Sequence, residues 1–307
     1  MKINSVLIAG AGAVGLPLAE TIHKYDPACV SILAKGERLE RYKKNGLWAN
    51  GEKINFRFSY GEKAGLIIVA SKFCHLGEII EDIRPSVGED TIILSLLNGI
   101  TSEEIIGSKL GRGPLPLAMI LGTDAFHKGE ETTYSRRGVI HFGDGHGNNG
   151  EREESIAKFF ARTGVAFKLE DNMKRALWYK FMINVASNQL TAILRLPYGA
   201  IMNKGGSGEI SEARLLHENA MREVIAVANA EGVDLNESDI GNWYNTVNLL
   251  RPEGFTSMCQ DVLAGRKTEL EMFSPVIMEL AKKHSISVPV CETLYLEMRT
   301  IEARYSD

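Results

Sequence analysis

Cysteines are few in this chain of 307 residues, and their spacing excludes the frameworks that cysteines usually build. The four are Cys29, Cys74, Cys259 and Cys291, and no two of them stand in C-x-x-C spacing. A disulfide-bonded scaffold or a zinc site of paired cysteines is therefore not expected. Thiols scattered in this way suit a reducing compartment, so the pattern predicts a cytoplasmic protein.

An excess of positive charge and long apolar runs are lacking as well. The 35 Lys and Arg residues are outnumbered by 39 Asp and Glu residues, which gives a net charge of −4. Such a balance provides no general attraction to nucleic acid or to an anionic membrane surface. No apolar run approaches the roughly 20 residues of a membrane span. Neither nucleic acid nor a membrane is expected as a partner.

What is present is a change of pattern near residue 171. The earlier part alternates short apolar runs, rich in Val, Ile and Leu, with helical stretches, which predicts an α/β fold with a mostly parallel sheet. The later part has helical periodicity, which predicts an all-α domain. The length also favours two domains, at 1–170 and 171–307. The predicted strands are 5–9, 30–33, 66–70, 91–97, 117–121 and a short one in 138–145. The predicted helices of the later part are 173–194, 211–231, 253–280 and 289–304.

The stretch "VLIAGAGAVGLPLAE" places glycines directly between the first predicted strand and a helix. Three glycines can simply mark a tight turn. In the strand–turn–helix context they instead fit the G-x-G-x-x-G turn, where bare backbone lets a pyrophosphate approach a helix N-terminus. The predicted cofactor-binding turn consists of Gly10, Ala11, Gly12, Ala13, Val14 and Gly15.

The end of the second predicted strand indicates which dinucleotide is bound. Asp or Glu commonly stands there when the ribose carries a free 2′-hydroxyl, whereas this chain has Ala34 and Lys35, with Arg38 close behind. Two cations at this place would attract a 2′-phosphate, which predicts NADPH rather than NADH. The alternative is that both are ordinary solvated charges on a loop.

Two further residues follow predicted strands, at the edge where open α/β sheets bind ligands. Lys72 comes after "LIIVAS" and Asn98 after "TIILSLL". Taken singly, a lysine there is often only solvated and an Asn-Gly pair is often only a turn. Both therefore remain candidates for contacts with the dinucleotide.

The predicted helix 173–194 is apolar on nearly every side, as buried helices are, yet it carries a polar stripe. Lys180, Asn184 and Asn188 fall at i, i+4 and i+8, so they lie on one face. Burying them without partners would cost several kcal/mol, so the stripe faces either polar neighbours or a ligand. An exposed stripe is the alternative. Burial lowers the pKa of a lysine, which suits Lys180 to donate a proton to a ketone oxygen.

Later in the chain two more candidates lie close together in sequence. "GFTSMCQD" supplies Ser257 as a compact hydrogen-bond donor, and "GRKTELEMF" supplies Glu269 as a carboxylate. By contrast His141, Asp144 and His146 gather in a glycine-rich turn, where such residues are frequent anyway, so no metal site is expected there.

Together these motifs resemble the ketopantoate reductase (2-dehydropantoate 2-reductase) family over nearly the whole chain. "GAGAVG", the basic Lys35, "SK" at 71–72, "LNG" at 97–99, "LGT" at 121–123 and "GVIHFG" at 138–143 come in order. "LWYKFMINVASNQLTAI" at 177–193, "TSMCQD" at 256–261 and "GRKTELE" at 265–271 complete the set. The glycine turn is shared by many families. The K-x-x-x-N-x-x-x-N helix with S-M-x-Q-D and T-E is far more specific.

The resemblance implies a Rossmann-type domain with a mostly parallel sheet followed by an all-α domain. It implies NADPH-dependent reduction of 2-dehydropantoate, a small 2-oxo acid, to pantoate in pantothenate biosynthesis and the coenzyme A pathway. Lys180 would be the proton donor, and Glu269 would contact the cofactor and order the catalytic site. Lys35 would meet the 2′-phosphate and Lys72 would lie beside the dinucleotide. The substrate would be bound by Lys180, Asn98, Asn184, Asn188 and Ser257, with Asn98 also touching the nicotinamide side of the cofactor.

Four departures from relatives bear on the substrate. Gln189 stands where many relatives have proline, Gly254 and Tyr198 where some have asparagine, and Lys128 where some have a small residue. The reduction chemistry is untouched by them, but the identity of the 2-oxo acid stays open. A reductase of another 2-oxo acid is one alternative, and a non-catalytic NADPH sensor is a weaker one. The oligomeric state is open too, with a homodimer among the alternatives.

Overall fold

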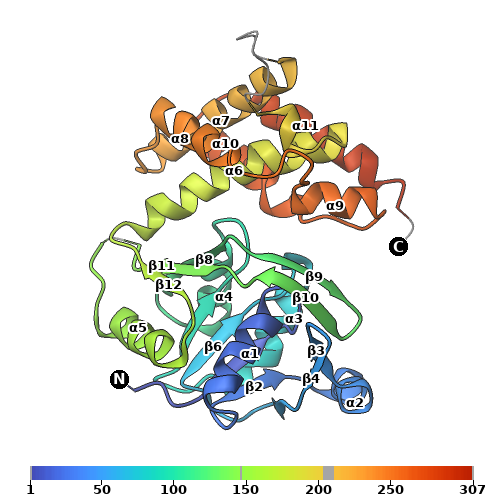
Figure 1. Ribbon diagram of the computed structural model, residues 1–307. Coiled ribbons are helices and arrows are strands. Elements are labelled where there is room, and N and C mark those ends of the chain that lie inside the picture. The colour runs from blue at the N-terminus through green and yellow to red at the C-terminus, as the bar shows by residue number, and fades with distance from the viewer. Residues whose placement is uncertain (1, 146, 203–210, 306–307) are drawn as a thin grey trace. The chain divides into compact units, whose positions relative to one another are not determined.

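The computed structural model describes residues 2–145, 147–202 and 211–305 (Figure 1). The chain divides into two compact units, Met1–Lys174 and Arg175–Asp307. The first contains the sheets and the second is built from helices (Figure 1). The predicted fold class, a Rossmann-type sheet domain followed by an all-α region, is confirmed.

The main sheet of the first unit has five strands in the order β5-β2-β1-β6-β7. Every neighbouring pair in it is parallel. The strands are β1 (Val6–Ala9), β2 (Val30–Leu33), β5 (Arg57–Ser59), β6 (Leu66–Val69) and β7 (Ile92–Ser95). The chain runs from β1 to β2 on one side and later to β6 on the other side of β1. This reversal makes the carboxyl ends of the neighbouring strands β1 and β6 the topological switch point, where open α/β sheets bind ligands.

Both faces of this sheet are buried, which explains its unbroken runs of Val, Ile and Leu. Val6 and Ile8 of β1 belong to a core shared with α1 and α5, whereas Leu7 points to the opposite face and is 1% exposed. The helices of this unit are α1 (Gly15–Tyr25), α2 (Gly36–Asn45), α3 (Leu76–Ile83), α4 (Ser102–Leu110) and α5 (Glu151–Thr163). Two 3₁₀ turns, η1 (Phe73–His75) and η2 (Arg84–Ser86), flank α3.

Two smaller sheets complete the first unit and correct part of the prediction. Residues 117–121 form β8 (Leu117–Leu121), which was expected in the parallel sheet but lies in a three-stranded sheet of order β12-β11-β8, antiparallel to β11. A four-stranded sheet of order β4-β3-β10-β9 was not predicted, because its strands are short and rich in polar residues. The strands of the four-stranded sheet are β3 (Leu47–Ala49), β4 (Glu52–Ile54), β9 (Asp124–Lys128) and β10 (Glu131–Arg136). The partners of β8 in the three-stranded sheet are β11 (Val139–Gly143) and β12 (Phe167–Leu169).

Helices account for the second unit, and no strand occurs among its described residues. They are α6 (Met173–Leu194), which begins at the end of the first unit, α7 (Glu212–Ala230), α8 (Glu237–Val247), α9 (Ser257–Leu263), α10 (Ser274–Lys283) and α11 (Pro289–Glu302), with 3₁₀ turns η3 (Tyr198–Ala200) and η4 (Leu270–Met272). The predicted single helix 253–280 is wrong. Gly265 adopts φ +64° just after α9, and α10 begins separately with Pro275 in its first turn.

A search of the described helices finds none with the length and apolar character needed to cross a membrane. The four cysteines are all free thiols, three of them buried and Cys74 exposed.

Candidate active site

The glycine turn joins β1 to α1 at the switch point of the main sheet. Gly10 adopts φ +118°, which favours glycine, and a Cβ on it would lie 2.4 Å from the carbonyl oxygen of Ala70. A Cβ on Gly15 would lie 1.9 Å from the carbonyl oxygen of Gly10. Close packing of the turn against β6 and against itself therefore requires glycine at both positions.

Gly12 differs from the other two glycines, because a Cβ on it would have no heavy atom within 4 Å. Its carbonyl oxygen accepts a hydrogen bond from Leu16 N at 3.0 Å, so the turn leads directly into the first turn of α1. Open space beside bare backbone at a helix N-terminus is what a pyrophosphate group needs. The residues present thus fit a dinucleotide, and the space beside Gly12 is the feature that shows the fit.

Three more predicted residues follow strands of the same sheet. Lys35 comes two residues after β2, Lys72 three residues after β6, and Asn98 three residues after β7. Since all these strands are parallel, their carboxyl ends lie along one edge, together with the glycine turn. Lys35 and Lys72 are exposed and Asn98 is half-buried. The cofactor-binding residues predicted in the first unit therefore share one edge.

Lys35 has a buried acidic partner on α3. Its ammonium pairs with the carboxylate of Asp82, and it also lies 5.1 Å from the centroid of the Tyr60 ring. The hydrogen bond to Asp82 raises the pKa of the Lys35 ammonium. Beside this pair, Arg38 Nη2 lies 3.2 Å from Oε1 of Glu78, also on α3. The two predicted 2′-phosphate cations are thus each paired with a carboxylate.

The polar stripe of α6 is partly withdrawn from solvent. Asn188 is 7% exposed, whereas Lys180 and Asn184 are half-buried. Around them the helix is packed by Phe181, which contacts Phe273 with ring centroids 6.4 Å apart. Phe273 ends the short segment that carries Glu269, so this aromatic contact holds that segment against α6.

A pair of buried threonines sets the place of Ser257. The hydroxyls of Thr191 on α6 and Thr256 are 2.8 Å apart, and Thr256 Oγ1 also accepts from Cys259 N as the N-cap of α9. Ser257 is the exposed first residue of α9, and Thr191 comes three residues after Asn188. The amide stripe and the serine are therefore attached to one framework.

The segment before Glu269 is held by the end of α11. Both the backbone N–H and the hydroxyl of Thr268 donate to Oε1 of Glu302, at 2.8 Å and 2.5 Å. Thr268 Oγ1 accepts from Leu270 N at 3.2 Å. Glu269 is half-buried between these two anchored residues, so its backbone position is fixed from both sides.

Two of the residues that depart from the relatives are in contact. Tyr198 N donates to the carbonyl oxygen of Gly254 at 2.8 Å. A Cβ on Gly254 would lie 3.3 Å from Cδ2 of the Tyr198 ring. Tyr198 therefore uses space that a side chain at 254 would need. Of the other two, Gln189 Nε2 donates to the carbonyl oxygen of Val185 within α6, and Lys128 is exposed at the end of β9.

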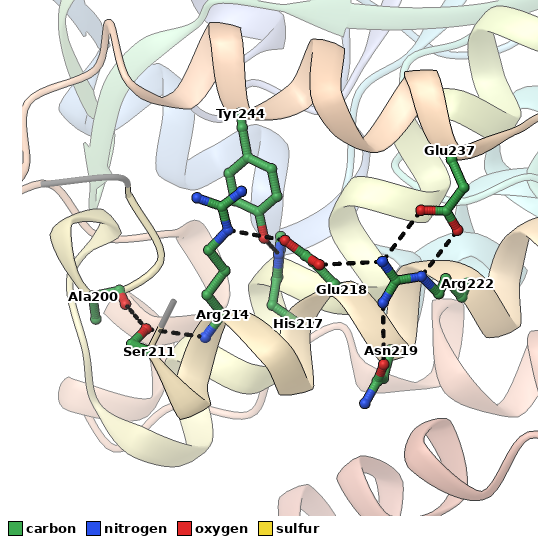
Figure 2. Close-up of polar contacts among 9 residues, drawn as sticks. All are labelled: Ala200, Ser211, Arg214, His217, Glu218, Asn219, Arg222, Glu237 and Tyr244. Carbon is green, nitrogen blue, oxygen red and sulfur yellow. Dashed lines mark hydrogen bonds and ion pairs between the residues drawn. The ribbon is translucent and has the colours of Figure 1, made fainter. Parts of the chain in front are cut away.

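A buried network around His217 fixes α6 against α7 and α8. His217 Nε2 lies 2.8 Å from Ser187 Oγ, and Nδ1 lies 2.9 Å from the Tyr244 hydroxyl. Figure 2 shows the guanidinium of Arg214 beside the Tyr244 ring, 3.8 Å from its centroid, and Glu218 bonded to both Arg214 and Arg222. Ser187 is adjacent to Asn188, so this network fixes the rotation of α6 about its axis and with it the direction in which the polar stripe faces.

His217 gives the second unit a pH-dependent stability. Burial, aided by the Arg214 charge, lowers its pKa to about 3. The unfolded chain binds a proton here below about pH 6.5 while the folded chain does not, so stability falls as the pH drops from 6.5 towards 3. We expect His217 to account for a loss of about 2 kcal/mol in unfolding free energy between pH 7 and pH 5.

Urea unfolding of the wild type and of His217→Gln at both pH values measures this loss. The glutamine can keep a donor and an acceptor but does not titrate, so the variant should lose about 2 kcal/mol less than the wild type on acidification. His75→Gln, at an exposed histidine, is the matched control and should behave as the wild type. Equal pH dependence in His217→Gln and wild type would contradict the assignment.

The predicted site residues thus form two sets. One comprises the glycine turn, Lys35, Lys72 and Asn98 on the first unit, and the other comprises Lys180, Asn184, Asn188, Ser257 and Glu269 on the second. Among the described residues no cluster of His, Cys, Asp and Glu suits a metal ion. His141 Nδ1 instead lies 2.7 Å from Glu170 Oε1, and His146 lies outside the described residues.

Several supporting residues were missed by sequence reasoning. Asp82, Thr191, Thr256 and Glu302 make contacts that depend on tertiary packing, which no local pattern reveals. His217 left a signal, because it occupies the buried face of α7 together with Ala220, Met221 and Val224. A histidine in an apolar stripe indicates a buried hydrogen-bond network.

Comparison with known proteins identifies the family. The family model described as "Ketopantoate reductase PanE/ApbA" matches residues 6–147, and the model described as "Ketopantoate reductase PanE/ApbA C terminal" matches residues 172–302. The chain belongs to the ketopantoate reductase PanE/ApbA family. Membership makes it an oxidoreductase of the class that acts on CH–OH groups with a nicotinamide cofactor.

Individual relatives of this ketopantoate reductase family member are distant. It is 26% identical to the 2-dehydropantoate 2-reductase of Lactococcus lactis, over 94% of this chain and 95% of the relative. It is also 26% identical to the uncharacterized oxidoreductase YkpB of Bacillus subtilis, over 97% and 98%. With the 2-dehydropantoate 2-reductase of Pyrococcus horikoshii the identity is 27% over 97% of each.

Solved structures share the fold. The PanE/ApbA family ketopantoate reductase of Ralstonia eutropha has a TM-score of 0.82 at 25% identity, covering 98% of this chain and 99% of that one. A dimeric ketopantoate reductase of Staphylococcus aureus has a TM-score of 0.81 at 21% identity, covering 98% and 100%. D-mandelate dehydrogenase, solved with NADH, has a TM-score of 0.84 at 22% identity, and the match covers 98% of this chain and 100% of that one. One fold therefore serves ketopantoate reductases and a mandelate dehydrogenase.

Proposed function

We propose that this family member reduces 2-dehydropantoate (ketopantoate) to pantoate with NADPH as the cofactor. The observation that carries the proposal is the stripe of half-buried Lys180 and Asn184 and buried Asn188, anchored to Ser257 through the Thr191–Thr256 hydrogen bond. One ammonium, two amides and a hydroxyl provide donors for a carboxylate, a ketone oxygen and the hydroxyl of a 2-oxo acid.

The cofactor would be held by the glycine turn, Lys35, Lys72, Asn98 and Glu269, the last supported by the Thr268–Glu302 anchor. When bound, the nicotinamide supplies the hydride for the ketone carbon. Lys180 donates a proton from Nζ to the ketone oxygen, so the ketone becomes a secondary alcohol. Asn184, Asn188 and Ser257 bind and orient the carboxylate and hydroxyl groups of the substrate. Asn98 would contact the substrate and the nicotinamide side of the cofactor.

A second candidate is the reduction of another small 2-oxo acid with the same residues. It is favoured by the Tyr198–Gly254 contact, since relatives with asparagines at these positions have amides there to offer the substrate. Tyr198 presents a phenol ring instead, which suits a less hydroxylated or more apolar acid. A non-catalytic NADPH sensor is less favoured, because the complete polar stripe would then have no use.

NADPH oxidation followed at 340 nm tests the proposal. We expect the purified chain to turn over ketopantoate faster than pyruvate, 2-oxoisovalerate or phenylglyoxylate, by about tenfold or more in kcat/KM. Turnover of only another panel member would transfer the function to the second candidate. Binding of NADPH without any turnover would favour the sensor.

The proposal also includes a homodimer. Light scattering tests it by measuring the mass of the protein in solution.

A further inference from the structure

We propose that Asp82, on α3, is a specificity-determining residue that weakens the preference of this chain for NADPH over NADH. The inference rests on the proposed cofactor role of Lys35 and goes beyond it. The sequence places two cations, Lys35 and Arg38, after the second strand, and they predict NADPH rather than NADH. The structure shows a site of different charge.

Asp82 is a nearly buried acid with an exposed basic partner. Its side chain is 4% exposed, whereas that of Lys35 is 47% exposed. Its neighbours on the same helix include Ile79, Ile80 and Ile83, all at most 2% exposed. A carboxylate among apolar side chains requires a compensating charge, and the Lys35 ammonium is the cation placed against it.

This pairing leaves a bound 2′-phosphate two arrangements, and both are unfavourable. Lys35 can swing towards the phosphate, which leaves the Asp82 carboxylate buried without that cation. Lys35 can instead bridge the two groups, which brings a phosphate dianion close to a carboxylate of like charge in a region of lowered dielectric constant. The 2′-hydroxyl of NADH carries no charge and meets neither penalty.

The neighbouring pair acts in the same direction but more weakly. Glu78 stands one helical turn before Asp82 and pairs with Arg38, so Lys35, Arg38, Asp82 and Glu78 sum to zero charge. The Glu78 side chain is 53% exposed, however, and solvent screens its effect on a phosphate. Burial therefore singles out Asp82 as the residue that reduces the attraction for the phosphate.

Equilibrium binding of NADPH and NADH, followed by nucleotide fluorescence, tests the proposal without any substrate. We expect Asp82→Asn to tighten NADPH binding about tenfold and to change NADH binding by less than about twofold. Glu78→Gln makes the same change of charge on the same helix and should shift NADPH binding by less than about twofold. The double variant Lys35→Met with Asp82→Asn should bind NADPH no more tightly than Lys35→Met alone.

Each other outcome overturns the inference. Weaker NADPH binding by Asp82→Asn would mean that the carboxylate orients Lys35 for the phosphate rather than competing with it. Equal gains in Asp82→Asn and Glu78→Gln, or a gain without Lys35, would mean a general charge effect. Thermal unfolding of each variant without nucleotide verifies that it folds. If Asp82→Asn fails to fold, Asp82→Ser is measured in its place. If the wild type binds neither nucleotide, the proposed function itself fails.

Discussion

Replacing Lys180 by methionine is expected to lower kcat for ketone reduction by about a thousandfold, which is the usual contribution of a positioned general acid. Methionine keeps most of the apolar volume of the lysine side chain but cannot donate a proton. Since Lys180 is proposed to bind the substrate and is not among the residues proposed to hold the cofactor, NADPH should still bind with an unchanged dissociation constant. Single-turnover absorbance at 340 nm measures the rate, and nucleotide fluorescence measures binding.

Lys283→Met is the matched control for this variant. Lys283 is a lysine of the same unit, exposed on α10 and paired with Glu231, and its loss should leave kcat within about twofold because such surface pairs contribute little. Retention of more than a tenth of the wild-type rate by Lys180→Met would remove Lys180 as the proton donor.

The second large effect is expected at the glycine turn. Gly12→Val should weaken NADPH binding by at least about a hundredfold, since the valine side chain would occupy the space that a pyrophosphate needs. The fold should tolerate the change, because a Cβ on Gly12 meets no heavy atom within 4 Å. Nucleotide fluorescence and thermal unfolding together separate the two effects.

Two further variants control for the consequences of adding a side chain. Gly113→Val also adds a side chain where a Cβ meets nothing within 4 Å, but away from the turn, so it should bind NADPH normally. Gly15→Ala forces its Cβ towards the Gly10 carbonyl oxygen and should destabilise the unit by about 2 kcal/mol or more. Normal NADPH binding by Gly12→Val would refute the proposed cofactor position.

The sequence predicted those parts of the fold whose signals are local. The bounds of α6 were predicted as residues 173–194 because helix-forming residues dominate this long stretch. The strand–glycine–helix pattern likewise located β1, the turn and α1. Residues 117–121 were recognised as a strand, but their sheet was wrong, since an apolar run looks the same in either sheet. Gly265 and Pro275 interrupt the predicted helix 253–280, and their effect was underestimated.

For the candidate site, sequence reasoning found residue types and missed their partners. Spacing placed Lys180, Asn184 and Asn188 on one helical face, because i, i+4 geometry depends on the helix alone. Spacing could not show that Asp82 faces Lys35, 47 positions away, or that Glu302 holds Thr268. Such contacts are fixed by tertiary packing. A buried partner such as Asp82 changes the net charge of a site, and only the tertiary structure reveals it.

The contact between Tyr198 and Gly254 makes these two positions depend on each other in evolution. A Cβ at 254 would lie 3.1 Å from the carbonyl oxygen of Arg251 and 3.3 Å from Cδ2 of the tyrosine ring, so a smaller residue at 198 removes one of its two closest contacts. A smaller residue at 198, with glycine kept at 254, leaves unfilled space. Exchange between this arrangement and one with two asparagines thus passes through an unfavourable single variant in either order. Laboratory evolution towards a new 2-oxo acid should randomise both codons at once.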